Sequence, residues 1–153
     1  MKFLASKHYG KEGTGEMMIS LVESFFSDLG PLLGESLQDF FALVASIPYK
    51  NDFELLPATD ENQSELISRP KYLLDNSIFE KLDCKKKAIL MASWAEGNGT
   101  PWRFIAVQEI GFPSYHHVFT QMKLGGSWFN VDPTFPGFKL FEPKPLVMRA
   151  VIL

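Results

Sequence analysis

Cysteine is almost absent from this sequence, since Cys84 is the single thiol among 153 residues. One thiol excludes an intrachain disulfide and a structural zinc site made of several thiolates. Long apolar runs are absent too, because none approaches the roughly 20 residues that cross a bilayer. The apolar stretch within residues 1–8 is too short for a secretory signal. We therefore expect a cytoplasmic protein without a membrane span, although a viral or processed product would share these features.

The sequence also has no excess of positive charge. Its 15 basic and 18 acidic side chains give a formal net charge of -3. This balance argues against nucleic acid as a partner, because phosphate neutralisation needs clustered cations. Apolar residues make up 46% of the chain, which is enough to bury a core and excludes wholesale disorder. Polar, glycine-containing residues 1–15 predict a flexible N-terminal arm, which leaves residues 16–153 as a single domain.

Apolar residues at helical spacing predict two amphipathic helices early in this domain. The first covers about residues 18–29 and ends at a Gly-Pro pair. The second covers about residues 37–44 and stops at Pro48. Residues 50–76 are mixed and polar, so we expect a long excursion with little regular structure, of the kind that is often functional.

The second half of the sequence predicts one more helix and then strands. The helix runs from Cys84 to about Glu96 and presents small residues on one face. Strand patterns follow at 102–109, 115–124, 127–132 and 146–153. Helices followed by antiparallel strands are typical of the α+β class. The last strand pattern has two interpretations, a strand that completes the fold or an apolar docking surface for a protein partner.

Cys84 begins the third helix, and the residues around it favour a thiolate. Asp83 is a good N-cap, because its carboxylate can accept from the unpaired N–H groups of the first turn. The thiol then faces the positive end of the helix dipole, and three lysines at 85–87 follow it. A lone cysteine is more often a small buried apolar residue. Thiolates at helix starts, however, are the nucleophiles of cysteine enzymes.

A Gly-Gly pair at 125–126 predicts a two-residue hairpin turn. Counting back from this turn, His117 and Asp132 become diagonal neighbours on one face of the hairpin, with Cβ atoms at most roughly 7–8 Å apart. His116 points to the opposite face. Singly, a strand histidine and an aspartate before proline usually have structural roles. Together they can place a carboxylate against one imidazole nitrogen and leave the other nitrogen free for a thiol.

Cysteine, histidine and aspartate are the three side chains that nucleophilic attack on a carbonyl requires. The thiol attacks, the imidazole takes and returns the proton, and the carboxylate orients the ring and stabilises the imidazolium. The backbone N–H of Cys84 can stabilise the tetrahedral oxyanion. The sequence leaves the second oxyanion donor open, with Tyr49, Tyr72 and Trp102 as candidates.

Several segments resemble the motifs of transglutaminase-like proteins. Asp-Cys-Lys-Lys-Lys-Ala-Ile-Leu at 83–90 is similar to their nucleophile segment, and Thr-Pro-Trp-Arg-Phe at 100–104 to the strand that follows it. His-Val-Phe at 117–119 and Gly-Ser-Trp-Phe-Asn-Val-Asp-Pro-Thr at 126–134 resemble the histidine and aspartate motifs. Ser-Ile-Pro-Tyr-Lys-Asn-Asp at 46–52 resembles a stretch of the bacterial transglutaminase-like cysteine peptidases.

This resemblance covers about residues 40–136 and implies a papain-like thiol fold, with the cysteine-bearing helix packed on an antiparallel sheet. It also implies a catalytic triad of Cys84, His117 and Asp132, with no cofactor and no metal. The sequence departs from the pattern beside the nucleophile. Leu82 replaces the usual glycine, and lysines at 85–86 replace residues that are often acidic.

These observations favour a thiol-dependent hydrolase that cleaves an amide in a protein or peptide through a Cys84 acyl-enzyme. Acyl transfer to an amine, or deamidation, uses the same intermediate and is the first alternative. A catalytically silent interaction module on the same fold is the second. A metal site made of Cys84, His116, His117 and Asp132 is a minor third, because neighbouring strand residues point to opposite faces.

Overall fold

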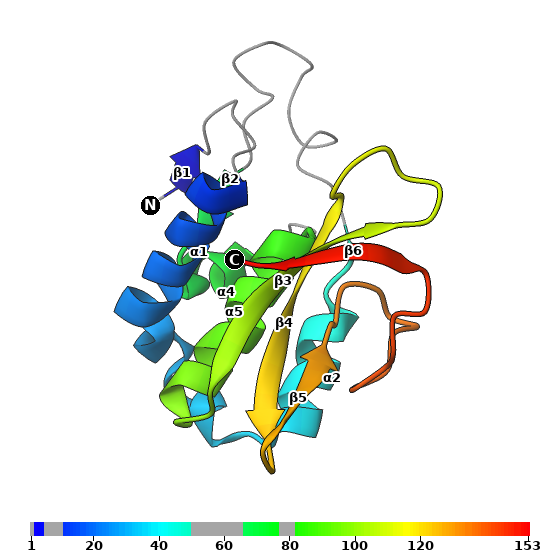
Figure 1. Ribbon diagram of the computed structural model, residues 1–153. Coiled ribbons are helices and arrows are strands. Elements are labelled where there is room, and N and C mark those ends of the chain that lie inside the picture. The colour runs from blue at the N-terminus through cyan, green and yellow to red at the C-terminus, as the bar shows by residue number, and fades with distance from the viewer. Residues whose placement is uncertain (1, 5–10, 50–65, 77–81) are drawn as a thin grey trace.

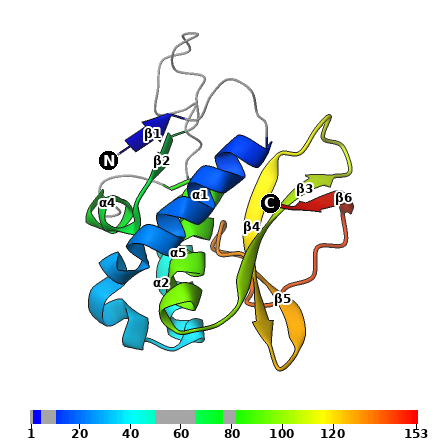
Figure 2. The same ribbon diagram turned by 60° about the vertical axis from the view of Figure 1, so that its left-hand side comes forward.

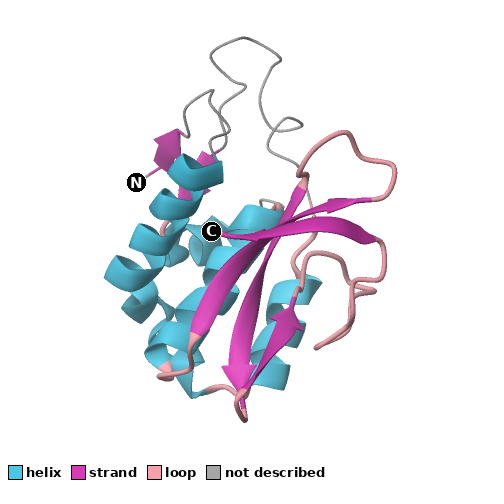
Figure 3. Cartoon of the chain, viewed as in Figure 1, coloured by secondary structure: helices cyan, strands magenta, loops and turns pink. Residues whose placement is uncertain are grey.

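The computed structural model describes residues 2–4, 11–49, 66–76 and 82–153. Within these residues, a layer of helices packs against one face of a four-stranded antiparallel sheet (Figures 1 and 3). A separate two-stranded sheet joins β1 (Lys2–Leu4) to β2 (Leu66–Ser68). The predicted α+β class is therefore confirmed.

The main sheet has the strand order β5-β4-β3-β6, and every neighbouring pair is antiparallel. Its strands are β3 (Trp102–Glu109), β4 (His117–Leu124), β5 (Ser127–Val131) and β6 (Val147–Ile152). All four strands were predicted, with bounds that agree to within two residues. Because β6 pairs with β3, the C-terminal segment completes the sheet, and a protein partner at this edge stays a prediction.

The helical layer is built around a single buried helix, α5. The helices are α1 (Lys11–Phe25), the 3-10 segment η1 (Phe26–Gly34), α2 (Leu37–Ser46), α4 (Pro70–Asn76) and α5 (Cys84–Gly97). Helix α5 lies between the other helices and strands β3 and β4 (Figure 2). From Cys84 to Ala95, every residue except Lys85 is buried. Small and apolar residues on all sides of α5 permit this central position.

The β4–β5 hairpin has the predicted register. Leu124 pairs with Ser127 across Gly125 and Gly126, whose φ angles are 58° and 85°. Positive φ at both turn residues is what a tight hairpin needs and what glycine supplies at little cost. Since the turn fixes the pairing of the whole ribbon, it also determines which residues meet at the far end of β4.

A buried hydroxyl joins α5 to this ribbon. Thr120 is fully buried on β4, and its Oγ1 donates to the backbone oxygen of Ala88, one turn after the start of α5, at 2.8 Å. A buried hydroxyl needs such a partner, because an unpaired one costs about 1–3 kcal/mol. The bond holds the first turns of α5 close to β4.

The N-terminal segment differs from the predicted arm. Lys2–Leu4 form β1, and α1 begins at Lys11, so the boundary expected after residue 15 falls inside a helix. Glycine is unfavourable by about 1 kcal/mol within a helix, which is why the sequence suggested a loop. Gly15 is nevertheless buried against Leu153, where an added Cβ would lie 2.9 Å from the leucine Cβ. Close packing with the C-terminal residue therefore overrides the local preference.

The expected excursion at residues 50–76 also contains regular structure. Strand β2 and helix α4 occupy its second half, whereas residues 50–65 lie outside the described residues. Arg69 precedes α4 and makes two hydrogen bonds to Asp28 of η1, from Nε at 2.7 Å and from Nη2 at 2.6 Å. This ion pair joins positions 41 residues apart, so no local pattern could have predicted it.

The two helices that the sequence predicts early in the domain are present, with one difference. Helix α2 begins after Ser36, whose side chain accepts from the N–H of Asp39 at 3.1 Å. The first predicted helix is α-helical only to Phe25 and continues as η1, which bends at Gly30. Among the helices described, none is both long and apolar enough to cross a bilayer.

Candidate active site

Cys84 is the first residue of α5, as predicted, and its side chain is 7% exposed. The N-cap Asp83 accepts from the N–H of Lys86 at 3.1 Å and pairs with the Lys85 ammonium at 2.8 Å. Burial raises the pKa of Asp83, but the charges of Lys85 and Lys86 outweigh it and hold the pKa below its usual value. The predicted cap is confirmed, and the ammonium of Lys85 balances the negative charge of the Asp83 carboxylate.

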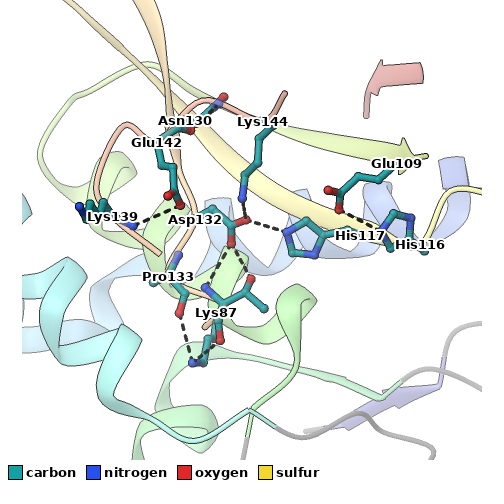
Figure 4. Close-up of polar contacts among 11 residues, drawn as sticks. Lys87, Glu109, His116, His117, Asn130, Asp132, Pro133, Lys139, Glu142 and Lys144 are labelled. Carbon is teal, nitrogen blue, oxygen red and sulfur yellow. Dashed lines mark hydrogen bonds and ion pairs between the residues drawn. The ribbon is translucent and has the colours of Figure 1, made fainter. Parts of the chain in front are cut away.

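The third lysine of this run has a different partner set. Lys87 is fully buried, and its Nζ donates to the backbone oxygen of Ile47 at 2.5 Å. It also donates to the backbone oxygens of Pro133 and Thr134 at 3.2 and 2.9 Å (Figure 4). Burial lowers the pKa of Lys87 to about 8, although the charge of Asp132 acts in the opposite direction. Lys87 is therefore separate from Lys85 and Lys86, because its ammonium contacts backbone oxygens whereas the other two lysines act on Asp83.

His117 and Asp132 meet at the end of the β4–β5 ribbon, as the hairpin register predicted. The last paired residues of the ribbon are Thr120 and Val131, so both side chains lie just beyond it. Nε2 of His117 is 2.7 Å from Oδ2 of Asp132 (Figure 4). The predicted diagonal contact between histidine and carboxylate is therefore present.

The thiol of Cys84 completes this group. From the start of α5, it lies close enough to His117 to raise the pKa of the imidazole, through a hydrogen bond and through its charge. Because Asp132 occupies Nε2, the ring nitrogen left for the thiol is Nδ1. The structure thus brings together the three residues that the sequence singled out, and their catalytic role stays a prediction.

The electrostatics of the group favour a charged imidazole. Burial lowers the pKa of His117, but hydrogen bonds and charge interactions with Asp132 and Cys84 outweigh it and raise the pKa to about 10. Burial likewise raises the pKa of Asp132, whereas His117 and Lys144 lower it to about 2. A histidinium between two acidic groups is the charge state expected of a cysteine–histidine nucleophile.

Four donors hold the buried carboxylate of Asp132. Oδ1 accepts from the backbone N–H and the hydroxyl of Thr134 at 3.2 and 2.5 Å. Oδ2 accepts from His117 and also from Nζ of Lys144. The Asp-Pro-Thr bend therefore fixes one oxygen within three residues of chain, while the other oxygen faces the site.

Three contributors to this site were not identified from the sequence. The sequence marks Thr134 only as the last residue of the aspartate motif, and Lys87 only as part of a run of three lysines. Lys144 lies in a proline-rich tail with no periodicity that would mark it. Each acts through contacts that follow from tertiary packing, so only the short Asp-x-Thr spacing offered a local sign, that of an Asx turn.

His116 precedes β4 and makes its own contacts, although its ring centroid lies 6.3 Å from that of His117. Its Nε2 is 3.1 Å from Oε1 of Glu109 (Figure 4), and its ring stacks on Phe112 with centroids 3.6 Å apart. Over the described part of the chain, no three histidine, cysteine, aspartate or glutamate side chains are grouped so that they could hold a metal ion. The geometry thus gives no support to the alternative metal site.

The three candidates for the second oxyanion donor lie in different places relative to Cys84. Trp102 donates its Nε1–H to Glu96 at 2.6 Å, near the C-terminal end of α5. A helix rises about 1.5 Å per residue, so this indole lies roughly 18 Å from Cys84 along α5 and is excluded as a donor. Tyr49 forms a parallel β-bridge with Leu82, which brings its backbone beside the approach to Cys84. Tyr72 lies half-exposed on α4.

Comparisons with known proteins add little to this geometry. No family model matches the chain, and no curated protein matches it. A solved structure described as a "putative cysteine protease" from Cytophaga hutchinsonii is similar over 92% of this chain, with a TM-score of 0.48 and 11% identity. The chain spans about half of that structure, 47% of its length. A likeness this distant does not decide an activity.

The charge state of His117 can be measured directly. We expect its imidazole to remain protonated at pH 8 and to titrate near pH 10, because Asp132 and Cys84 both stabilise the cation. Imidazole nitrogen chemical shifts measured by NMR against pH report this. Cys84→Ala should lower the midpoint, since one of the two partners is lost. A wild-type midpoint near 6.5, the ordinary histidine value, would show that the group is not coupled as described.

Proposed function

We propose that this protein is a thiol-dependent hydrolase that cleaves an amide bond in a protein or peptide through a covalent Cys84 acyl-enzyme. The observation that carries the proposal is that His117 contacts both the Cys84 thiol and the buried carboxylate of Asp132. The sequence resemblance to transglutaminase-like cysteine peptidases supports the same three residues, since each of them lies in one of the matching motifs.

The geometry supports a two-step reaction. The sulfur attacks the amide carbonyl carbon as a thiolate whose proton is held by His117, and a tetrahedral intermediate forms. The imidazolium then donates that proton to the leaving nitrogen, the carbon–nitrogen bond breaks, and a thioester remains on Cys84. Water, deprotonated by His117, attacks the thioester, and the thiol regains its proton as the acid leaves. Asp132 keeps the imidazole oriented throughout and stabilises its charged form.

The start of α5 offers the first oxyanion donor. The N–H of Cys84 belongs to the first turn of the helix, where N–H groups have no acceptor within the helix. This N–H can donate to the oxygen of the tetrahedral intermediate while the helix dipole favours the negative charge.

An activated acyl ester tests whether the thioester forms. With p-nitrophenyl acetate we expect a burst of one equivalent of p-nitrophenol and a matching acetyl mass increase on the peptide that contains Cys84. Cys84→Ala should lose both, because the burst requires the sulfur. Ser93→Ala is a control on the same helix, since the hydroxyl of Ser93 donates to the backbone oxygen of Ile89 and is not part of the proposed site. Absence of both burst and adduct in the wild type would instead support the interaction module.

Competition between acceptors separates hydrolysis from amine transfer. We expect most of the acyl group to be released as the free acid when glycine ethyl ester is present at millimolar concentration. Mass spectrometry of the products gives the ratio of acid to amide. Predominant amide formation would favour the transglutaminase alternative, which shares the acyl-enzyme and differs only in the second step.

A further inference from the structure

Lys144 contacts the same carboxylate oxygen as the histidine of the site. Its Nζ and Nε2 of His117 both donate to Oδ2 of Asp132 (Figure 4). Hydrolysis through Cys84 needs only the histidine contact, so the lysine is an additional cation. Its side chain is 12% exposed, which means that it is held in the site and does not lie freely on the surface.

Hydrogen bonds hold the tail segment that carries Lys144 against β5. The N–H of Phe141 donates to the backbone oxygen of Asn130 at 3.0 Å, and Nδ2 of Asn130 donates to the oxygen of Glu142 at 3.0 Å. Gln121 on β4 in turn donates to Oδ1 of Asn130 at 2.9 Å. These bonds bring the tail back across the end of the ribbon, where Asp132 follows β5.

Two aromatic rings line the position of the ammonium group. Nζ of Lys144 lies 4.0 Å from the ring centroid of Phe138 and 5.3 Å from that of Phe119. Aromatic faces attract cations within about 6 Å, so these rings stabilise the charged lysine independently of the carboxylate. Three groups from three parts of the chain therefore converge on one ammonium, which makes a chance surface contact a poor explanation.

Because His117 and Lys144 share one oxygen of Asp132, each of these two ion pairs is weaker than it would be alone. A carboxylate that also holds an ammonium binds the imidazolium less tightly, and the lysine charge repels the imidazolium directly. The charged or titratable groups facing Asp132 are His117, Lys144 and Lys87, and His117 also faces Cys84. Of these groups, Lys144 is the one that can weaken the histidine–aspartate pair without a part in the chemistry.

We propose that Lys144 is a positioning residue that fixes the Asp132 carboxylate and lowers the proton affinity of His117, so that the imidazolium can release its proton to the leaving nitrogen. This role rests on the proposed hydrolase function. An imidazolium bound by Asp132 alone would hold its proton more strongly and would be the weaker general acid. Lys144 thus balances two demands on His117, to accept the thiol proton and then to release it.

The test is the NMR titration of His117 in Lys144 variants of the full chain. Lys144→Met keeps most of the alkyl packing and removes the charge, and we expect it to raise the His117 midpoint by about one pH unit. Lys144→Gln should raise it similarly, since it keeps a donor without the charge. Lys144→Arg should stay near the wild-type midpoint. A midpoint unchanged in both neutral variants would overturn the proposal and leave Lys144 as a structural anchor.

Two further outcomes keep the test decisive. If both neutral variants fail to fold while Lys144→Arg folds, Lys144 serves stability alone and the proposal is wrong. The titration needs no substrate, so its result is independent of the acyl ester burst. Shifted midpoints without any burst would refute the hydrolase function and support the electrostatic effect of Lys144. A normal burst with unshifted midpoints would support the hydrolase function and refute the effect of Lys144.

Discussion

Replacement of His117 with alanine should slow the acylation of Cys84 by about 10²–10⁴-fold, the usual contribution of a positioned general base. Among the described residues, the imidazole contacts the carboxylate of Asp132 and lies beside the thiol, so its loss removes the proposed proton acceptor of Cys84. Stopped-flow measurement of the p-nitrophenol burst gives the acylation rate for each protein.

His116→Ala is the matched control for this substitution. The two histidines are adjacent in sequence, but His116 pairs with Glu109 and stacks on Phe112, away from Asp132. We expect its acylation rate to stay within about threefold of the wild type, because its loss removes no group from the proposed reaction. Equal losses in both variants would indicate general damage to the strand and would count against the assigned base.

Alkylation of Cys84 gives a second comparison of these proteins. Iodoacetamide should react with Cys84 more slowly in His117→Ala than in the wild type or in His116→Ala, because only the first variant loses the imidazole beside the thiol. Equal rates in all three proteins would contradict the contact between sulfur and imidazole.

The core of the site could be predicted because it depends on short-range rules. The Gly-Gly turn fixes the ribbon register, and that register alone brings His117 and Asp132 together. The Asp83 cap likewise fixes where α5 begins and therefore where Cys84 lies. Turn geometry and helix capping act over a few residues, so the sequence contains all the information they need.

The supporting contacts could not be predicted because they join distant segments. Lys144 reaches Asp132 only after the tail folds back over the end of the sheet. Arg69 pairs with Asp28, which lies 41 residues earlier in the sequence. This pair holds helix α4, where the sequence indicated a loop. Neither lysine nor arginine carries a local pattern that identifies its partner, since any nearby carboxylate would satisfy it.

Lys87 is the supporting contact whose removal should be most damaging to the fold. Lys87→Met should lower the free energy of unfolding by about 3–5 kcal/mol, because a buried cation is removed from its partners and three buried carbonyls lose their donor. Those carbonyls belong to Ile47 and to Pro133 and Thr134, so the loss also loosens the bend that holds Asp132. Urea unfolding followed by circular dichroism measures the change.

Lys123→Met provides the matched control, because this lysine is exposed on β4 and its loss should change stability by less than about 0.5 kcal/mol. Equal stability of Lys87→Met and Lys123→Met would show that the three carbonyls do not depend on the ammonium. The acyl ester burst in Lys87→Met, measured below its unfolding midpoint, should also fall, since Asp132 is then less firmly placed. A destabilised variant with an undiminished burst would show that Lys87 contributes to stability and not to the reaction.

The pH dependence of stability tests whether burial disfavours the charged form of Lys87. Its pKa is lowered from 10.5 to about 8 in the folded protein, so between these values the unfolded chain binds more protons. Stability contributed by this group therefore increases with pH across that window, by up to about 1.4 kcal/mol per pH unit. The difference in unfolding free energy between wild type and Lys87→Met should widen as pH rises from 8 to 10.5. A difference in unfolding free energy that stays constant with pH would mean that Lys87 keeps its ordinary proton affinity and that burial does not destabilise its charged form.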